Sequence, residues 1–162
     1  TPAPEGTTQA VLVDIVDLGM QPDKFNEGEV VHQVRLSFQT EEKTEEGKPF
    51  IVSTFGYKAS LNSKSNFYKA IATILGRKLN SDDFDKEGDV DLDALLIGKN
   101  VNLTIVHNKK GENTYANIEA ISPLIKSQKT VLKPEGYTRM QDREAVAVEG
   151  GDEEASVATF SG

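Results

Sequence analysis

The pattern of hydrophobic and polar positions predicts three short strands in the first part of the chain. Residues 8–18 are rich in β-branched side chains, residues 29–40 alternate between apolar and polar positions, and residues 49–58 resume a strand pattern. A period of two along the chain indicates a half-buried strand. Gly56, inside the third segment, suggests a bulge or a close approach of backbone to another group.

A helix is predicted after the third strand, where the period of the pattern changes. From an N-cap at Ser63 or Ser65, apolar residues follow the i, i+3, i+4, i+7 spacing of an amphipathic helix, and Gly76 supplies its stop. The apolar positions are Phe67, Ala70, Ile71, Ile74 and Leu75. Further on, Asp91 is placed to cap a short helical turn.

Two more strands complete the predicted domain. Residues 100–108 alternate again, residues 114–122 form the returning strand, and a turn that contains Gly111 lies between them. The order β-β-β-α-β-β, mainly β with a helix between strands 3 and 4, is that of a five-stranded OB-fold barrel. We therefore expect an OB-fold domain over residues 1–126. Residues 127–162 are expected to form a flexible tail, basic at first and then acidic and disordered.

Charge is distributed unevenly along the chain. The net charge of −8 and a pI near 4.8 argue against a simple nucleic-acid binder, which is usually basic. Residues 141–162, however, hold six acidic residues against one arginine, whereas residues 47–81 hold six basic residues and no acidic one. A one-sign stretch of this length produces a field that steers an anion.

Composition excludes several classes of protein. The absence of cysteine rules out disulfides, thiolate metal sites and cysteine nucleophiles. No apolar run approaches the roughly 20 residues of a membrane span, and no signal-peptide pattern opens the chain. We expect a cytoplasmic protein without membrane contact. His32 and His107 fit no catalytic triad, and no phosphate-binding or dinucleotide loop is present, so we expect no enzymatic activity and no cofactor.

Aromatic and basic side chains suggest a surface for single-stranded DNA, because such a surface needs rings for base stacking and cations for phosphate. Phe55 and Tyr57 share one face of the third strand, but Ile51 shares it too, so the core is the alternative location of both rings. A lysine on an outer helix face is ordinarily just solvated, and the turn at Gly111 is equally a plain polar turn. The candidate DNA contacts are Arg35, Phe55, Tyr57, Lys58, Lys64, Lys69, Arg77, Lys109, Lys110 and Tyr115.

The acidic segment over residues 83–94 is close to a calcium-binding EF-hand loop. Its last position, where a bidentate glutamate belongs, is Ala94. We therefore expect a solvated acidic loop and no metal site. A metal-dependent nuclease that uses the Asp82–Asp93 carboxylates remains as an alternative.

The C-terminal segment combines acidic residues with a nearly terminal aromatic ring. Asp152, Glu153 and Glu154 precede Phe160, and this pattern suits docking into a basic pocket with an apolar floor. We expect these four residues to bind partner proteins. The alternatives are that the tail lies on the protein's own basic groove or only aids solubility.

Several short motifs resemble a group of phage-encoded OB-fold proteins that bind single-stranded DNA and are associated with replication. The resemblance covers residues 10–125 and differs at Leu75, where such proteins often carry a larger aromatic residue. Its motifs are the Ser-Leu-x-x-Lys-Ser helix start, the Gly-Arg helix end, the Gly-Lys turn and the closing strand. They contain Ser60, Leu61, Lys64, Ser65, Gly76, Arg77, Gly98, Lys99, Gly111, Tyr115, Ala116, Asn117 and Ile118.

The resemblance implies single-stranded DNA binding with little sequence preference, in phage DNA replication or recombination in the host cytoplasm. The acidic tail would then bind replication or recombination proteins. A structural or adaptor module of a phage particle or replisome, without DNA affinity, is the alternative. The sequence leaves open whether the chain forms a homo-oligomer.

Overall fold

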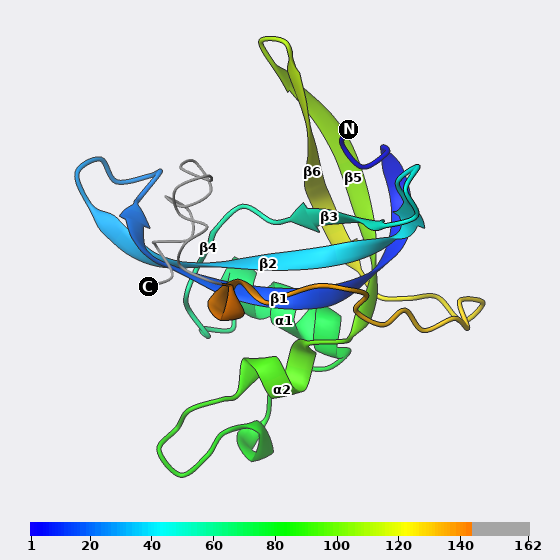
Figure 1. Ribbon diagram of the computed structural model, residues 1–162. Coiled ribbons are helices and arrows are strands. Elements are labelled where there is room, and N and C mark those ends of the chain that lie inside the picture. Colours follow the sequence, from blue (N-terminus) through cyan, green and yellow to red (C-terminus); the bar gives the residue numbers. More distant parts are fainter. Residues whose placement is uncertain (144–162) are drawn as a thin grey trace.

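The structure, a computed structural model, describes residues 1–143 (Figure 1). Strands dominate this part of the chain. The strands are β1 (Gly6–Pro22), β2 (Val30–Lys43), β3 (Pro49–Ser53), β4 (Tyr57–Lys58), β5 (Asn100–Lys110) and β6 (Asn113–Ser122). The helices are α1 (Asn66–Leu75) and α2 (Leu92–Leu96), with short 3₁₀ turns η1 (Ser81–Asp83) and η2 (Met140–Asp142).

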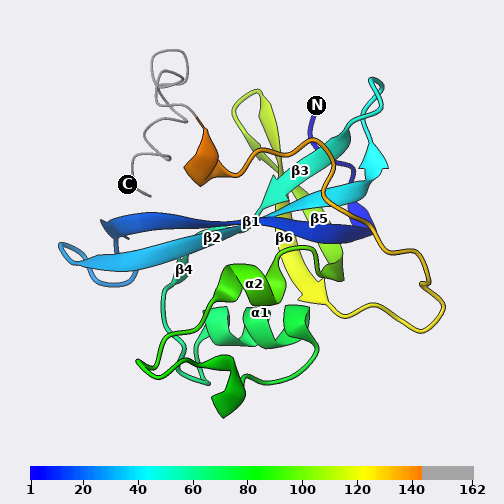
Figure 2. The ribbon, with the colours of Figure 1, turned by 60° about the horizontal axis from the view of Figure 1, so that its bottom comes forward.

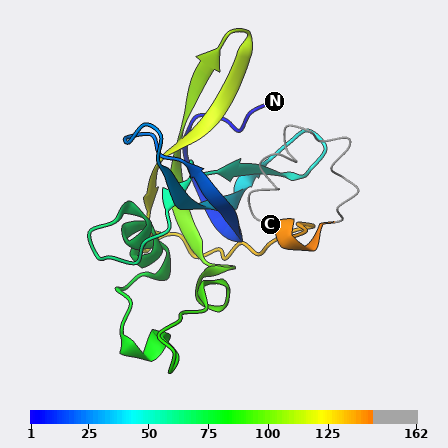
Figure 3. The ribbon, with the colours of Figure 1, turned by 90° about the vertical axis from the view of Figure 1, so that its left-hand side faces the viewer.

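The strands form one antiparallel sheet in the order β3-β2-β1-β5-β6, and β4 pairs with β2 beyond the end of β3. The sheet curls into a half-barrel, and the β5–β6 hairpin projects beyond it (Figures 1 and 3). The expected mainly β fold, with a helix after the third predicted strand, is confirmed. That third strand differs from the prediction because it breaks into β3 and β4. At the break, Thr54 accepts a hydrogen bond from the Leu36 amide through its hydroxyl (3.0 Å) and donates one from its own amide to the Leu36 carbonyl (2.9 Å).

Gly56 lies at this break and allows a close approach, as its position in the strand pattern suggested. A Cβ at Gly56 would lie 2.2 Å from Oε1 of Gln33 and 3.2 Å from Cδ1 of Leu18. Both distances are shorter than an ordinary van der Waals contact, so a larger residue here would displace its neighbours. The missing side chain therefore lets the chain turn from β3 into β4 directly against β2.

The helices cover one side of the curled sheet and close the core there (Figure 2). Ser65 accepts a hydrogen bond from the Tyr68 amide (3.1 Å) as the N-cap of α1, and Gly76 ends that helix with a φ of 85°. Asp91 caps α2. These three predicted caps are confirmed. Ile71 of α1 is fully buried in the core, in a cluster with the apolar side chains of the strands.

Strand β1 is buried on both faces along its middle. Ala10 and Leu12 point into the core beneath the helices, while Val11 and Val13, each 1% exposed, lie outside that cluster. A segment that follows β6, residues 124–143, runs along β1 on the side away from α1 and α2 (Figure 2). We call this segment the strap. It explains why consecutive residues of β1 are all buried.

Side-chain amides of the sheet hold the backbone of the strap. Asn100 accepts a hydrogen bond from the Leu132 amide (2.8 Å) and donates one to the Leu132 carbonyl (2.9 Å). Gln39 does the same with the amide (2.7 Å) and carbonyl (2.8 Å) of Glu135. Each amide thus bonds the strap as a neighbouring strand would. Residues 127–143 are therefore part of the folded body, which differs from the flexible segment expected from the sequence.

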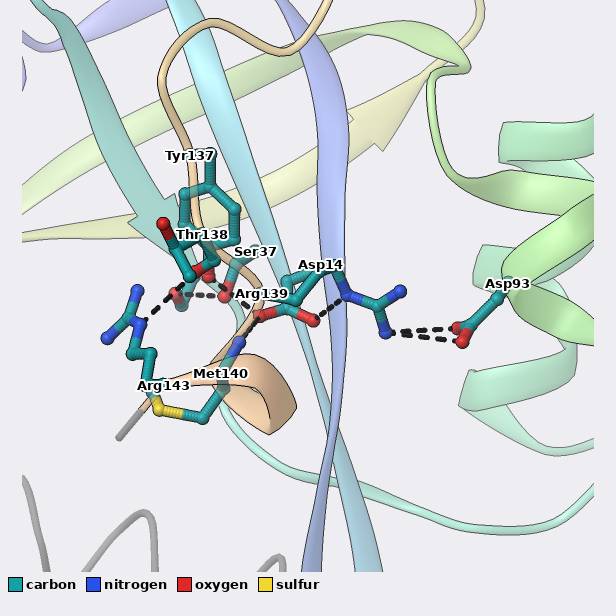
Figure 4. Close-up of polar contacts among 9 residues, drawn as sticks. Asp14, Ser37, Asp93, Tyr137, Thr138, Arg139, Met140 and Arg143 are labelled. Carbon is teal, nitrogen blue, oxygen red and sulfur yellow. Dashed lines mark hydrogen bonds and ion pairs between the residues drawn. The ribbon is translucent and has the colours of Figure 1, made fainter. Parts of the chain in front are cut away.

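The end of the strap is fastened by Asp14, which is 1% exposed on β1 (Figure 4). Its carboxylate accepts hydrogen bonds from the Tyr137 hydroxyl (2.8 Å), Nε of Arg139 (2.6 Å) and the Met140 amide (2.8 Å). The Arg139 guanidinium also pairs with Asp93 of α2 (3.2 Å). Burial opposes ionisation of Asp14, but the three donors outweigh it and hold its pKa below the usual value. Burial and the Asp14 carboxylate raise the pKa of Tyr137 to about 12.

Candidate nucleic-acid interface

A cleft of about 890 Å³ lies between β3 and the β5–β6 hairpin. We call it the hairpin cleft. Phe55 and Tyr115 line it, and both residues are exposed to solvent, at 63% and 47%. Lys109 and Lys110, at the tip of the hairpin, line it as well. The cleft therefore places two exposed rings and two cations within one concave surface.

The first residues of the chain form one wall of the hairpin cleft. Thr1, Pro2 and Ala3 line it, and Ala3 is buried. A ring nitrogen of His107 lies 2.6 Å from the Ala3 carbonyl, and the His107 amide donates to the Glu5 carboxylate (2.7 Å). These bonds tie the N-terminal segment to β5, so this wall is fixed to the sheet.

A second cleft of about 600 Å³ lies between the β1–β2 turn, β4 and the start of α1. We call it the lysine cleft. Lys24 comes from the turn, Lys58 from β4, and Lys64 from the segment just before α1. The β1–β2 turn thus adds a third cation to two that lie six residues apart in the sequence, and all three surround one hollow.

The two clefts meet at Phe55. Nζ of Lys24, from the lysine cleft, lies 4.9 Å from the centroid of the Phe55 ring, which lines the hairpin cleft. Lysine over an aromatic face at this distance is a cation–π contact. The rings and cations of both clefts therefore form one continuous surface.

This surface is positive although the chain is acidic. The residues that line the two clefts include five lysines and a single carboxylate, Asp23. Asp23 accepts hydrogen bonds from the Phe25 amide (2.8 Å) and the Asn26 side chain (2.9 Å). The Asn26 bond, more than the Phe25 bond, lowers the pKa of Asp23 below its usual value. The Asp23 carboxylate thus bonds groups of its own turn, and the lysines give the clefts an excess of positive charge that attracts anions.

The structure brings together seven of the ten predicted contact residues in the two clefts. They are Phe55, Tyr57, Lys58, Lys64, Lys109, Lys110 and Tyr115.

Tyr57 lines the lysine cleft, but its ring is only partly exposed and does not lie beside Phe55. The break between β3 and β4 separates the two rings, and Tyr57 packs against Phe67 of α1 with centroids 5.8 Å apart. Burial raises the pKa of its hydroxyl above the usual value. Tyr57 therefore belongs mainly to the edge of the core, and Phe55 is the ring that reaches solvent.

Arg77, Lys69 and Arg35 lie outside both sets of cleft-lining residues. Arg77 forms two hydrogen bonds, of 2.9 Å and 2.8 Å, with the Asp83 carboxylate, and this pairing lowers the pKa of Asp83 to about 2. Lys69 is exposed on α1. Arg35 lies opposite Val16 on β1, where its charge acts on Tyr137 of the strap. The positive charge of residues 47–81 is therefore divided between the clefts and other surfaces.

The sequence prediction missed Lys24 and Phe25, which both line the lysine cleft. Phe25 is 91% exposed at the tip of the β1–β2 hairpin. Glycine, proline and asparagine residues in the segment between the first two predicted strands indicate a loop. A lysine and a phenylalanine side by side in a polar turn were the available signal, because an aromatic ring is unusual at such a position.

The acidic loop after α1 uses its carboxylates within the fold. Asp85 accepts hydrogen bonds from the Glu87 and Asp89 amides (both 2.9 Å), and Asp91 caps α2. Within residues 1–143, no three histidine or acidic side chains are grouped so that they could hold a metal ion. The geometry of the loop therefore gives no support to the nuclease alternative.

The predicted partner-binding residues of the tail, Asp152, Glu153, Glu154 and Phe160, lie outside the described residues. In the part of the chain that the structure describes, no helix has the length and apolar character needed to cross a membrane. Comparison of the sequence with models of known protein families and with curated proteins finds no match. The function is therefore inferred from the clefts themselves.

Proposed function

We propose that this protein is a non-enzymatic OB-fold protein that binds single-stranded DNA with little sequence preference. The observation that carries the proposal is the pair of lysine-lined clefts that meet at the exposed Phe55 ring. A ring that lies in an acid-poor groove matches the two needs of single-strand binding, base stacking and phosphate neutralisation. Duplex DNA keeps its bases stacked on one another, so it offers nothing to such a ring.

The position of the clefts supports an OB-fold. OB-folds bind oligonucleotides on the face of strands 2 and 3 and on the loops between strands 1 and 2 and strands 4 and 5. Here β3 and β4 carry Phe55 and Lys58 on or between them, the β1–β2 turn carries Lys24, and the β5–β6 turn carries Lys109 and Lys110. The proposed process is phage DNA replication or recombination in the host cytoplasm, with the acidic tail as the site for protein partners.

The decisive measurement is the fluorescence anisotropy of equal-length single-stranded and duplex oligonucleotides, at low and moderate salt. Phe55→Ala should weaken single-strand binding roughly 5- to 150-fold, because stacking contributes about 1–3 kcal/mol per base. Lys58→Gln and Lys64→Gln should each reduce the log–log salt slope by about 0.7, which corresponds to one phosphate. Lys69→Gln is the matched control, since Lys69 is equally exposed but lies outside the cleft linings.

A structural or adaptor role is the second candidate, and one observation favours it. Ile51 of β3 is 53% exposed in the hairpin cleft, where the unpaired edge of β3 faces β6. An extended segment of another protein could add to such an edge. Equal, weak affinity for single strands and duplexes, unchanged by Phe55→Ala, would reject DNA binding and favour this role.

A further inference from the structure

The contact between Lys24 and Phe55 occupies the ring that the proposed function assigns to base stacking. Phe55 is 63% exposed, and Nζ of Lys24 lies 4.9 Å from the ring centroid. The turn that carries Lys24 is held in place, because the Asp23 amide donates to the Glu29 carbonyl (2.9 Å) and the Asp23 carboxylate accepts from the Phe25 amide (2.8 Å). The backbone at Lys24 is therefore held in place, while its long side chain is free to move toward or away from the ring.

A base and the Lys24 ammonium exclude each other on this face of Phe55. Stacked rings lie with their centroids about 4.5–7 Å apart, which is the space that the ammonium now occupies. A solvent-exposed cation–π contact is weak, so a stacking base can displace the lysine. The displaced ammonium stays on its tether at the junction of the two clefts, where the phosphate next to the stacked base would pass.

We propose that Lys24 is a gate on the Phe55 ring. In the free protein its ammonium covers one face of the ring, and it moves to a phosphate when a base stacks on that face. This inference rests on the proposed function and adds a selectivity that charge alone does not give. A strand with unstacked bases displaces Lys24 from the ring and gains an additional contact between Lys24 and a phosphate. A polyanion without bases leaves Lys24 on the ring and gains nothing from it. The gate therefore makes the surface selective for single-stranded nucleic acid over other polyanions.

Proton NMR of the full chain observes the gate directly. In the free protein, the ring current of Phe55 should shift the ε-methylene protons of Lys24 upfield relative to the same protons in Phe55→Leu. An oligothymidylate of about eight nucleotides, within the range that one OB-fold covers, should abolish this shift. An abasic strand of equal length should leave it in place.

The salt dependence of Lys24→Ala supplies the second test. With oligothymidylate, the variant should lose about 0.7 from the log–log salt slope, which weakens binding about fivefold at 0.1 M salt. With the abasic strand, its slope should equal that of the wild type. Lys48→Ala, on the exposed β2–β3 turn, is the control and should match the wild type with both strands.

The outcomes separate the gate from the proposed function. Binding of oligothymidylate with the Lys24 shift unchanged, or equal slope losses for the abasic and base-bearing strands, would overturn the gate and leave single-strand binding intact. No binding of oligothymidylate by the wild type would reject the proposed function, and the gate with it.

Discussion

Replacing Asp14 by asparagine should loosen the strap, at a cost that follows from the geometry. Oδ1 of Asp14 accepts from Nε of Arg139, while Oδ2 accepts from both the Tyr137 hydroxyl and the Met140 amide. An asparagine keeps most bonds by placing its oxygen at the Oδ2 position, so its NH₂ group then faces the Arg139 donor. One hydrogen bond to a charged partner is lost, which costs about 1.5–3 kcal/mol. Asp93 still pairs with Arg139, so we expect a loss of about 2–3 kcal/mol.

Thermal unfolding followed by circular dichroism measures this cost. For a chain of this size, a loss of about 2–3 kcal/mol lowers the Tm by roughly 5–10 °C. Asp89→Asn is the matched control, because this exposed carboxylate should change stability by less than about 0.5 kcal/mol. The Tyr137 pKa of about 12 should also fall in Asp14→Asn, because the carboxylate that helps to raise it is gone. Ultraviolet titration of tyrosine would detect that fall.

The stability that Asp14 contributes should decrease as the pH falls. The folded pKa of Asp14 is lowered, so its contribution is complete above the unfolded value of about 3.9 and is lost as the pH falls through the folded value. The Tm difference between wild type and Asp14→Asn should be constant from neutral pH to about pH 5 and shrink below about pH 4. Equal Tm values at pH 7, or a difference that persists unchanged at pH 2, would refute this account of the strap.

Three further results are expected. Gly56→Ala should destabilise the protein by about 1–3 kcal/mol, because the new Cβ overlaps the Gln33 side chain, and Gln33→Ala should restore much of the loss in chemical denaturation. Arg77→Ala should raise the NMR-detected pKa of Asp83 from about 2 toward its ordinary value and leave DNA affinity unchanged; a large loss of affinity would return Arg77 to the binding surface. A truncation after residue 126 should expose the outer face of β1 and aggregate, whereas one after residue 143 should keep the cooperative unfolding and the Tm of the full chain.

Local signals made the helix predictable from the sequence. Ser65 and Gly76 cap the two ends of α1, and each acts within one helical turn. The apolar spacing between them is likewise a local signal. The strands over residues 29–40 and 100–108 were predictable for a similar reason, because alternation shows which face of a strand is buried. The break between β3 and β4 was not, since it depends on how closely Gly56 approaches Gln33 of another strand.

The strap left little trace in the sequence because long-range bonds hold it. Residues 128–140 have no apolar period, and the backbone groups of Thr130, Leu132 and Glu135 bond amide side chains on three different strands. The signal that could have revealed it lies in β1, where Ala10 to Val13 form an uninterrupted apolar run. Such a run indicates a strand covered on both faces, and the helices supply cover for one face alone.

The candidate site was predictable in its charges but less so in its geometry. An acid-free window shows where lysines and arginines occur, but it does not show which carboxylate each of them faces. Arg77 lies in that window and is bound to Asp83, six residues further on. Lys24 lies outside it and completes the surface, because the β1–β2 turn folds back toward Phe55.

The strap also sets the order in which the molecule can be completed during synthesis. Asp14 lies on the first strand, and its partner Met140 follows 126 residues later. A growing chain can pair β1 with β2 early, but the outer face of β1 stays bare until almost all of the described chain has emerged. Closing so long a loop is slow, and a bare apolar strand is prone to aggregate in the meantime. The nascent protein therefore passes through an interval in which Val11 and Val13 are open to chaperones or to other copies.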